Sequence, residues 1–173
     1  MDEMRHPDPG PLAVAAAQEA ELDRYFVGLG LKRAQHELRL AINAELAGIG
    51  TNISQLNVLF FVRRHPRVSS ADLARLAFLT PQTLGQQVIQ MQKRGFVVRE
   101  PGPGRKIGHS LTEAGEKLLD AGMEKVREVT ERVFDDFTDE GLAGLLDAFQ
   151  TIERRAAESR AHTKRFSPFS VDL

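Results

Sequence analysis

Apolar residues recur with a helical spacing in the first third of the chain. The stripe comprises Leu31, Leu38, Ile42, Leu46 and Ile49. Steps of seven, four, four and three positions place these side chains on one face of an α-helix. Gly50 follows the last of them, and glycine is the usual residue just beyond a helix end. The pattern predicts one long helix that ends near residue 50.

A second helix is predicted from Ser54 to about His65. Ser54 is its expected N-cap. Pro66 ends it, because a residue that precedes proline avoids helical geometry. The inward side is expected to consist of Leu56, Leu59, Phe60 and Phe61.

Two further helices follow, each with its own start signal. Residues 69–72 read Ser-Ser-Ala-Asp, a capping box with Asp in place of Glu or Gln. Thr80 then caps the next helix, and Pro81 is favoured at its first position. The buried side of this helix is expected to be Leu84, Val88 and Met91, and Gly95 ends it. The opposite side presents Gln82, Thr83, Gln86, Gln87 and Gln90.

The rest of the chain predicts a β-hairpin and two long helices. Residues 96–99 favour a strand, residues 101–104 (Pro-Gly-Pro-Gly) a turn, and residues 105–111 a return strand. Thr112 caps a long helix, and Thr138 caps the last one, whose first turn is acidic. The apolar stripe of this last helix comprises Leu142, Leu145, Phe149, Ile152 and Ala156.

These elements give a mainly α fold with a small β-hairpin wing, in the order of a winged helix-turn-helix. We expect this winged domain to span residues 53–112. Residues 21–50 and 113–160 would form a helical dimerisation region, because their broad apolar stripes exceed what the middle domain can cover. Residues 1–20, rich in Pro and Gly at the start, would be a flexible N-terminal extension, and residues 161–173 a C-terminal tail.

The distribution of charge singles out the middle segment. The chain has 173 residues and a formal net charge of −1. Residues 60–111 hold nine Lys and Arg against two Asp and Glu, a net charge of +7, whereas residues 112–158 carry −7. A basic block between acidic flanks indicates that the middle segment meets a polyanion.

Double-stranded DNA fits this arrangement. An α-helix fits the major groove, where Gln and Thr side chains can bond base edges, and a cationic hairpin can lie along phosphates. The candidate DNA-binding residues are Ser70, Thr80, Gln82, Thr83, Gln86, Gln87, Gln90, Arg99, Arg105 and Lys106. Further phosphate contacts are expected from Arg63, Arg64, Arg67, Arg75, Lys93 and Arg94. A polar helix face alone is often merely solvated, so the order of elements and the basic block carry the prediction together.

The middle segment resembles the MarR family of bacterial transcriptional regulators. The matching stretches read SSADLA at residues 69–74, TPQTL at 80–84, KRGFVVR at 93–99 and LTEAG at 111–115, with Arg105 between the last two. The resemblance covers roughly residues 20–158. It implies a recognition helix over residues 80–94 and a wing over residues 97–111. The chain departs from the family where an acidic residue often precedes the wing Arg by two positions, because Pro103 stands there.

The resemblance also implies a homodimer, most often a repressor, that a small ligand releases from a palindromic operator. The family commonly takes small aromatic acids or phenolic compounds between the dimerisation helices and the winged lobe. Reasonable neighbours for such a ligand are His36, Arg39, Phe60 and Arg64. A histidine on an exposed helix face is more often simply solvated, which is the competing interpretation of His36.

Several other classes of function are disfavoured. The absence of Cys excludes a thiol sensor, and the five His residues lack paired metal-ligand spacing, so we expect neither a metal site nor a cofactor. No catalytic motif is found, so we expect no enzyme. No apolar run is long enough to cross a bilayer and the N-terminus lacks signal-peptide features, which predicts a cytoplasmic protein without membrane contact. The open alternative is a winged-helix protein-interaction module that does not bind DNA.

Overall fold

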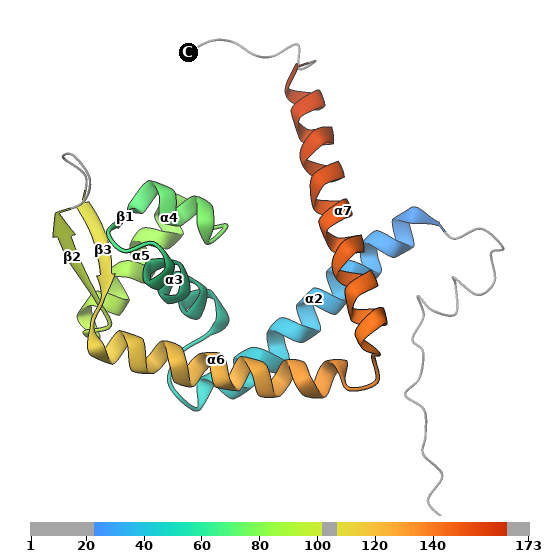
Figure 1. Ribbon diagram of the computed structural model, residues 1–173. Helices are drawn as coiled ribbons and strands as arrows, with labels where there is room; N and C mark the ends of the chain where they lie inside the picture. Colours follow the sequence, from blue (N-terminus) through green and yellow to red (C-terminus); the bar gives the residue numbers. More distant parts are fainter. Residues whose placement is uncertain (1–22, 102–106, 166–173) are drawn as a thin grey trace, which may run out of the picture. The chain divides into compact units, whose positions relative to one another are not determined.

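The computed structural model describes residues 23–101 and 107–165, which are mostly helical with one small sheet (Figure 1). The elements are α2 (Arg24–Ala47), α3 (Ile53–Arg64), β1 (Val68–Ser69), α4 (Ser70–Leu76), α5 (Pro81–Lys93), β2 (Val97–Pro101), β3 (Ile107–Leu111), α6 (Glu113–Phe134) and α7 (Asp139–Arg165). The predicted mainly α fold with a β-hairpin is confirmed. The predicted N-terminal extension and the Pro103 turn lie outside the described residues. α7 continues to Arg165, past the predicted start of the tail at residue 161.

Local capping side chains set most of the predicted helix starts. The Ser69 hydroxyl accepts a hydrogen bond from the Asp72 backbone N–H at 3.2 Å and donates to the Asp72 carboxylate at 2.5 Å. The Thr80 hydroxyl accepts from the backbone N–H of Thr83 at 3.1 Å, with Pro81 in the first turn of α5. Each cap satisfies an amide that the helix itself leaves free. The predicted helix start at Ser69, with Ser69 as its N-cap, and the predicted start of α5 are therefore confirmed.

The start of α3 differs from the prediction, because Asn52 and not Ser54 is the N-cap. The Asn52 side chain accepts from the backbone N–H of Gln55 at 3.0 Å. Asn43 of α2 reaches the backbone N–H of Ile53 at 2.9 Å. Because the side chains of Asn52 and Asn43 bond the backbone N–H groups of Gln55 and Ile53, the helix begins at Ile53, one residue before Ser54. The Ser54 hydroxyl instead accepts a hydrogen bond from Gln87 of α5.

The sheet has a third strand that the hydrophobic pattern did not predict. The strand order is β1-β3-β2, and both pairings are antiparallel. β1 has only two residues, too few for an alternating pattern to be read. Arg67, the residue just before β1, lies so close to β3 that a Cβ at Gly108 would stand 2.8 Å from its carbonyl oxygen. The wing is therefore attached to the chain that leads directly into α4.

The hydrophobic core is formed mainly by the winged domain and includes residues of α2 and α6. Ile42 and Leu46 of α2 and Leu119 and Val129 of α6 are buried with it. The central members are Leu56, Val58, Leu59, Val62, Leu73, Leu84, Val88, Met91 and Val97. Phe60 and Phe61, predicted to point inward, are only partly buried against this core. The buried side of α5 is as predicted.

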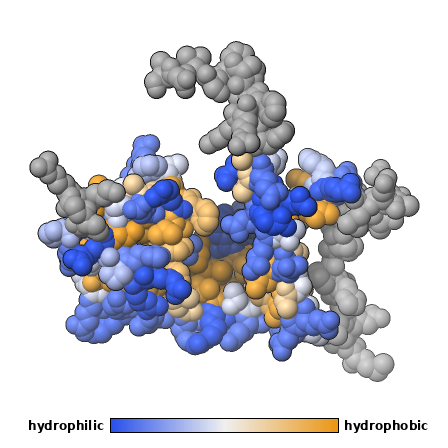
Figure 2. Space-filling view, turned by 45° about the horizontal axis from the view of Figure 1, so that its top comes forward, coloured by the Kyte–Doolittle hydropathy of each residue, from blue (hydrophilic) through white to orange (hydrophobic). Residues whose placement is uncertain are grey.

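The chain divides into two compact units, whose boundary falls within α6 at residues 129 and 130. In the second unit, α7 has no buried residue within its described side chains. Of its predicted stripe, Leu142 and Leu145 are half-buried, whereas Phe149, Ile152 and Ala156 are exposed. The first unit also exposes apolar side chains on α2, including Tyr25 and Leu40. Apolar surface lies open among the polar residues in Figure 2.

No helix among the described residues has both the length and the hydropathy that a membrane span requires.

Candidate nucleic-acid interface

α5 presents a row of amide side chains on the side opposite the core. Gln82, Gln86 and Gln90 are all exposed, and their spacing of four places them along one line of the helix. Thr83 is exposed beside them. Their position is held by Leu84, Val88 and Met91, each at most 2% exposed. The helix is thus fixed on one side and free to offer hydrogen-bonding groups on the other.

Gln87 does not belong to this exposed row, which corrects the sequence-based grouping. It is half-buried, and its amide nitrogen donates to the Ser54 hydroxyl at 2.7 Å. Its amide oxygen is buried and has no hydrogen-bond partner among the described residues. The helical period explains this, because Gln87 lies three positions after Leu84 and four before Met91, on the buried face. Gln87 therefore ties α5 to α3.

The start of α4 meets the wing through a buried histidine. Ser70 is exposed at the first position of α4, and its hydroxyl lies 2.8 Å from Nε2 of His109 in β3. His109 is 1% exposed and pairs across the sheet with Arg99 of β2, which is itself exposed. Burial lowers the pKa of the His109 imidazole below its ordinary value, and the charge of Arg99 lowers it further. Ser70 therefore contacts this buried ring, and Arg99 lies opposite His109 in the sheet.

These residues surround a shallow recess where α4, α5 and β2 converge. Its volume is about 280 Å³. The lining residues are Ser70, Ala71, Pro81, Leu84, Gly85, Val88 and Arg99. The structure therefore brings together two sequence-predicted contacts from different elements, Ser70 of α4 and Arg99 of β2, beside the first turns of α5. Arg105 and Lys106, the other predicted wing contacts, lie outside the described residues.

Two of the expected phosphate-binding arginines are instead engaged by carboxylates. Arg63 lies 2.5 Å from Asp120 and 3.7 Å from Glu116, both in α6. Arg75 forms an ion pair with Asp72 in the same helix. Arg94 lies over the ring of Phe96, 4.7 Å from its centroid. The sequence shows where Lys and Arg residues occur but not which of them have acidic or aromatic neighbours in the fold. The net charge of +7 counted for residues 60–111 therefore exceeds the positive charge that is available to bind phosphates.

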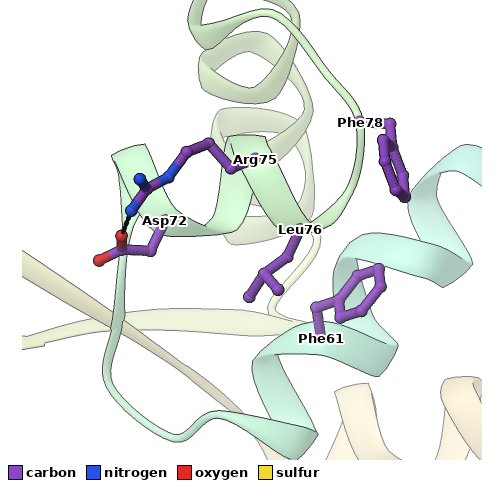
Figure 3. A pocket seen from close by; sticks show the side chains of 5 residues that line it. All are labelled: Phe61, Asp72, Arg75, Leu76 and Phe78. Carbon is purple, nitrogen blue, oxygen red and sulfur yellow. Dashed lines mark hydrogen bonds and ion pairs between the residues drawn. The ribbon is translucent and has the colours of Figure 1, made fainter. Parts of the chain in front are cut away.

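A second, larger pocket is lined by residues of α3 and α4 and by Phe78 (Figure 3). Its volume is about 530 Å³. Phe61 of α3 and Leu76 of α4 point toward one another, and the Arg75–Asp72 pair lies to one side. Phe78 follows α4 with an 88% exposed side chain and a φ of +54°. A bulky side chain in the left-handed region carries backbone strain.

The four residues predicted to hold a ligand are only partly brought together. His36 and Arg39, both exposed on α2, share a hydrogen bond of 3.2 Å between Nδ1 and the guanidinium. Phe60 packs edge to face on Phe61, with 5.4 Å between ring centroids. Arg64 is exposed near the end of α3. None of the four lines the recess or the pocket described above. Their role as a ligand site stays a prediction.

The described residues contain no group of three or more His, Cys, Asp or Glu side chains placed to hold a metal ion.

His109 is a site residue that the sequence does not predict. In the sequence it is one of five scattered histidines without metal-ligand spacing. Nothing in the local pattern indicates that His109 points inward toward Ser70, 39 positions earlier. The contact exists because β1 pairs with β3, a pairing of distant segments.

Comparisons with known proteins agree with this geometry. A model of the MarR family matches residues 49–106. The HTH-type transcriptional repressor Rv2887 of Mycobacterium tuberculosis is 30% identical over 109 residues, which cover 62% of this chain and 78% of the relative.

Solved structures show the same architecture. A MarR-family transcriptional regulator from Rhodococcus sp. RHA1 is 26% identical, with a TM-score of 0.68 over 78% of this chain and 96% of that one. Rv2887 in complex with DNA is 26% identical, with a TM-score of 0.61 over 72% and 95%, and the same protein has been solved with p-aminosalicylic acid. CouR from Rhodococcus jostii RHA1, bound to p-coumaroyl-CoA, is 25% identical, with a TM-score of 0.65 over 73% and 90%.

The fold and the similarities agree. The structure has a helix-turn-helix with an exposed row of amides and a three-stranded wing, and the similar proteins are regulators of one family. The chain belongs to the MarR family and is a DNA-binding transcriptional regulator with a winged helix-turn-helix.

Proposed function

We propose that the protein is a homodimeric repressor that binds a palindromic operator and leaves it when a small aromatic ligand binds. The observation that carries the DNA-binding part is the row of Gln82, Gln86 and Gln90, exposed on a helix whose other side is fixed in the core. Amide side chains pair well with adenine in the major groove, where each base pair has a distinct edge. α5 is the helix that would read sequence.

The remaining candidate contacts divide by their chemistry. Thr83 lies beside the glutamines and would contact bases, whereas Ser70, Thr80 and Arg99 would contact phosphates and fix the register of the helix. Arg105 and Lys106 are proposed as phosphate or minor-groove contacts on the strength of the sequence alone. Gln87 is left out of this interface because it bonds Ser54.

Dimerisation would bury the apolar side chains that one chain leaves open. Phe137, Leu146, Phe149 and Ile152, in or beside α7, are 41–58% exposed. Monomeric proteins rarely expose such sets of large apolar side chains. A two-fold dimer would also place two copies of α5 about 34 Å apart, the spacing of successive major grooves on one side of B-DNA.

The proposed ligand is an aromatic compound with an anionic group. p-Aminosalicylic acid and p-coumaroyl-CoA, found with two of the similar proteins, both share this chemistry. On this chain, the adjacent His36 and Arg39 would meet the anion, and Phe60 and Arg64 would complete the site. A ligand that favours a state unable to bind DNA would lower the affinity by its coupling free energy, typically about 1–3 kcal/mol.

We also infer that the protein acts in the cytoplasm, where its DNA target lies, and that it catalyses no reaction. Regulators of this family are generally DNA-binding proteins without enzymatic activity. The retained alternative is a winged-helix module that binds other proteins and not DNA. The response of DNA binding to salt separates the two functions.

The test is an anisotropy titration of a labelled duplex, selected from random sequences by the wild-type chain, at salt concentrations from 50 to about 300 mM. We expect binding that weakens steeply with salt, because phosphate contacts release counterions. Arg99→Ala and Arg105→Ala should weaken binding to all sequences similarly and make the salt dependence shallower. Gln150→Ala, on the exposed surface of α7, is the control and should bind like the wild type. A chain that binds no duplex at 50 mM salt would favour the protein-interaction module.

A further inference from the structure

The imidazole of His109 is buried, and its Nδ1 atom has no role in the DNA-binding surface described above. Its Nε2 contacts the hydroxyl of Ser70 at 2.8 Å. Its Nδ1 is buried and forms no hydrogen bond with any residue that the structure describes. One side of the ring is therefore linked to an exposed serine, and the other has no polar partner within residues 23–101 and 107–165.

The surroundings of the ring keep the imidazole neutral. Arg99 stands opposite it in β2, Val68 opposite it in β1, and Ser70 contacts it from α4. The backbone N–H of Arg67 donates to the carbonyl oxygen of His109 at 3.1 Å, which fixes β1 on β3. Burial and the nearby guanidinium both lower the pKa of the imidazole. A neutral imidazole carries one proton, on either Nδ1 or Nε2.

The unpartnered Nδ1 decides which nitrogen carries that proton. An N–H group buried without an acceptor costs the desolvation free energy of a donor, and such orphaned donors are rare in proteins. The less costly arrangement leaves a lone pair on Nδ1 and places the proton on Nε2. Nε2–H then donates to the Ser70 oxygen.

This arrangement determines what Ser70 can do at the surface. Because its oxygen accepts from His109, its own hydroxyl proton remains free to donate outward. In the other tautomer, Ser70 would donate to Nε2, and only its lone pairs would face the solvent. A phosphate oxygen accepts hydrogen bonds and donates none, so only the first arrangement suits a phosphate.

We propose that His109 is a positioning residue, which holds the Ser70 hydroxyl so that its proton points at a phosphate of the bound DNA. The proposal rests on the DNA-binding function above and adds a specific role for a residue outside the contact surface. It also explains why the wing and the start of α4 are joined by a side chain and not only by backbone bonds. Ser70 makes the contact, and His109 acts through it.

The first test observes the tautomer directly. Long-range nitrogen–proton correlation spectra of the ¹⁵N-labelled full chain at pH 7.5, without DNA, should show His109 protonated on Nε2. A pattern with the proton on Nδ1 would overturn the proposal, because Ser70 would then have no proton to offer.

The second test measures coupling between the two side chains in DNA affinity, on a duplex selected by the wild-type chain. Ser70→Ala and His109→Leu should each weaken binding about tenfold, the effect of one lost hydrogen bond in each half of a dimer. The double variant should bind no more weakly than Ser70→Ala. His109→Gln, which keeps an N–H donor near the same place, should recover most of the affinity.

Controls separate this role from a merely structural one. Val68→Ala loosens the same part of the sheet without removing a hydrogen bond to Ser70, and it should bind within about twofold of the wild type. Losses that add in the double variant, or a His109→Gln variant as weak as Ser70→Ala, would overturn the proposal while leaving DNA binding intact. A wild-type chain that binds no duplex would overturn the proposed function as well, so the two failures are distinguishable.

Discussion

At the scale of single residues, the winged domain depends on polar side chains that the core holds in fixed positions. His109 and Gln87 are the two described residues that have a buried, unpartnered side-chain atom. Each uses its other polar atom to contact a serine, Ser70 or Ser54. Such atoms cost free energy, so their contacts have to be specific to be retained. These contacts fix α4 against the wing and α5 against α3.

The lowered pKa of His109 predicts a pH dependence of stability. The unfolded chain protonates His109 near its ordinary pKa of 6.5, whereas the folded chain does so at lower pH. Below pH 6.5 the unfolded state therefore binds more protons, and the free energy of unfolding falls as the pH is lowered toward the folded-state pKa. Urea unfolding of the wild type and of His109→Gln between pH 8 and 5 measures this. The stability of the wild type relative to the variant should decrease below pH 6.5; a pH-independent difference would contradict the assignment.

At the scale of elements, close packing of α6 against the base of the wing sets the position of β2. A Cβ at Gly115 would stand 2.1 Å from the carbonyl oxygen of Phe96, the residue just before β2. The Thr112 backbone N–H donates to this same oxygen at 3.1 Å. Backbone approaches this close leave no space for any side chain. The wing therefore cannot shift on α6 without breaking this contact.

Gly115→Ala should destabilise the fold by about 1–3 kcal/mol, as expected for overpacking against backbone. Gly144→Ala in α7 is the matched control, since nothing lies within 4 Å of its added Cβ. There, alanine should stabilise the helix, by up to about 1 kcal/mol. Thermal or urea unfolding measures both variants. A Gly115→Ala protein as stable as the Gly144→Ala protein would show that α6 and the wing are not packed as described.

Capping residues and helical periodicity predicted most helices and strands. The features that they did not predict depend on contacts between residues that are far apart in the sequence. Ser69 and Thr80 cap helices that lie directly beside them in sequence, so their roles are readable from the chain. The helical period of α5 does predict that Gln87 lies on the buried side with Leu84 and Met91. The polar amide of Gln87, in contrast, favours an exposed position, and the sequence-based prediction followed the amide. His109 joins Ser70 through a strand pairing across about 40 residues. Such contacts depend on the tertiary fold, which short-range periodicity does not encode.

Across the whole molecule, exposed apolar side chains and acidic residues gather in the last part of the chain, and basic residues gather in the winged domain. Residues 112–158 carry a net charge of −7, which phosphates would repel. The basic residues lie in the winged domain, even though Arg63 and Arg75 are engaged by carboxylates. This distribution fits a dimer whose protomers meet through apolar side chains of α7 and bind DNA through the winged domain.

Phe149→Glu should disrupt the dimer, because Phe149 is one of the exposed apolar side chains of α7. A carboxylate buried in an apolar interface without a partner is strongly unfavourable. Sedimentation equilibrium at micromolar concentration should show a dimer for the wild type and mainly a monomer for the variant. Thr151→Glu introduces the same charge on the opposite side of α7 from Leu145 and Phe149 and should remain dimeric. A Phe149→Glu dimer with unchanged affinity would place the interface elsewhere.

In the proposed complex, two copies of α5 read base edges in successive major grooves. Selection of binding sites from random duplexes, with the wild type and with Gln86→Ala, tests it most directly. The wild type should select a palindrome whose half-sites lie about one helical turn apart. Gln86→Ala should lose preference at one base pair in each half-site and retain it at the others. A variant that selects the same sequence with the same preference as the wild type would contradict the assignment of α5 as the recognition helix.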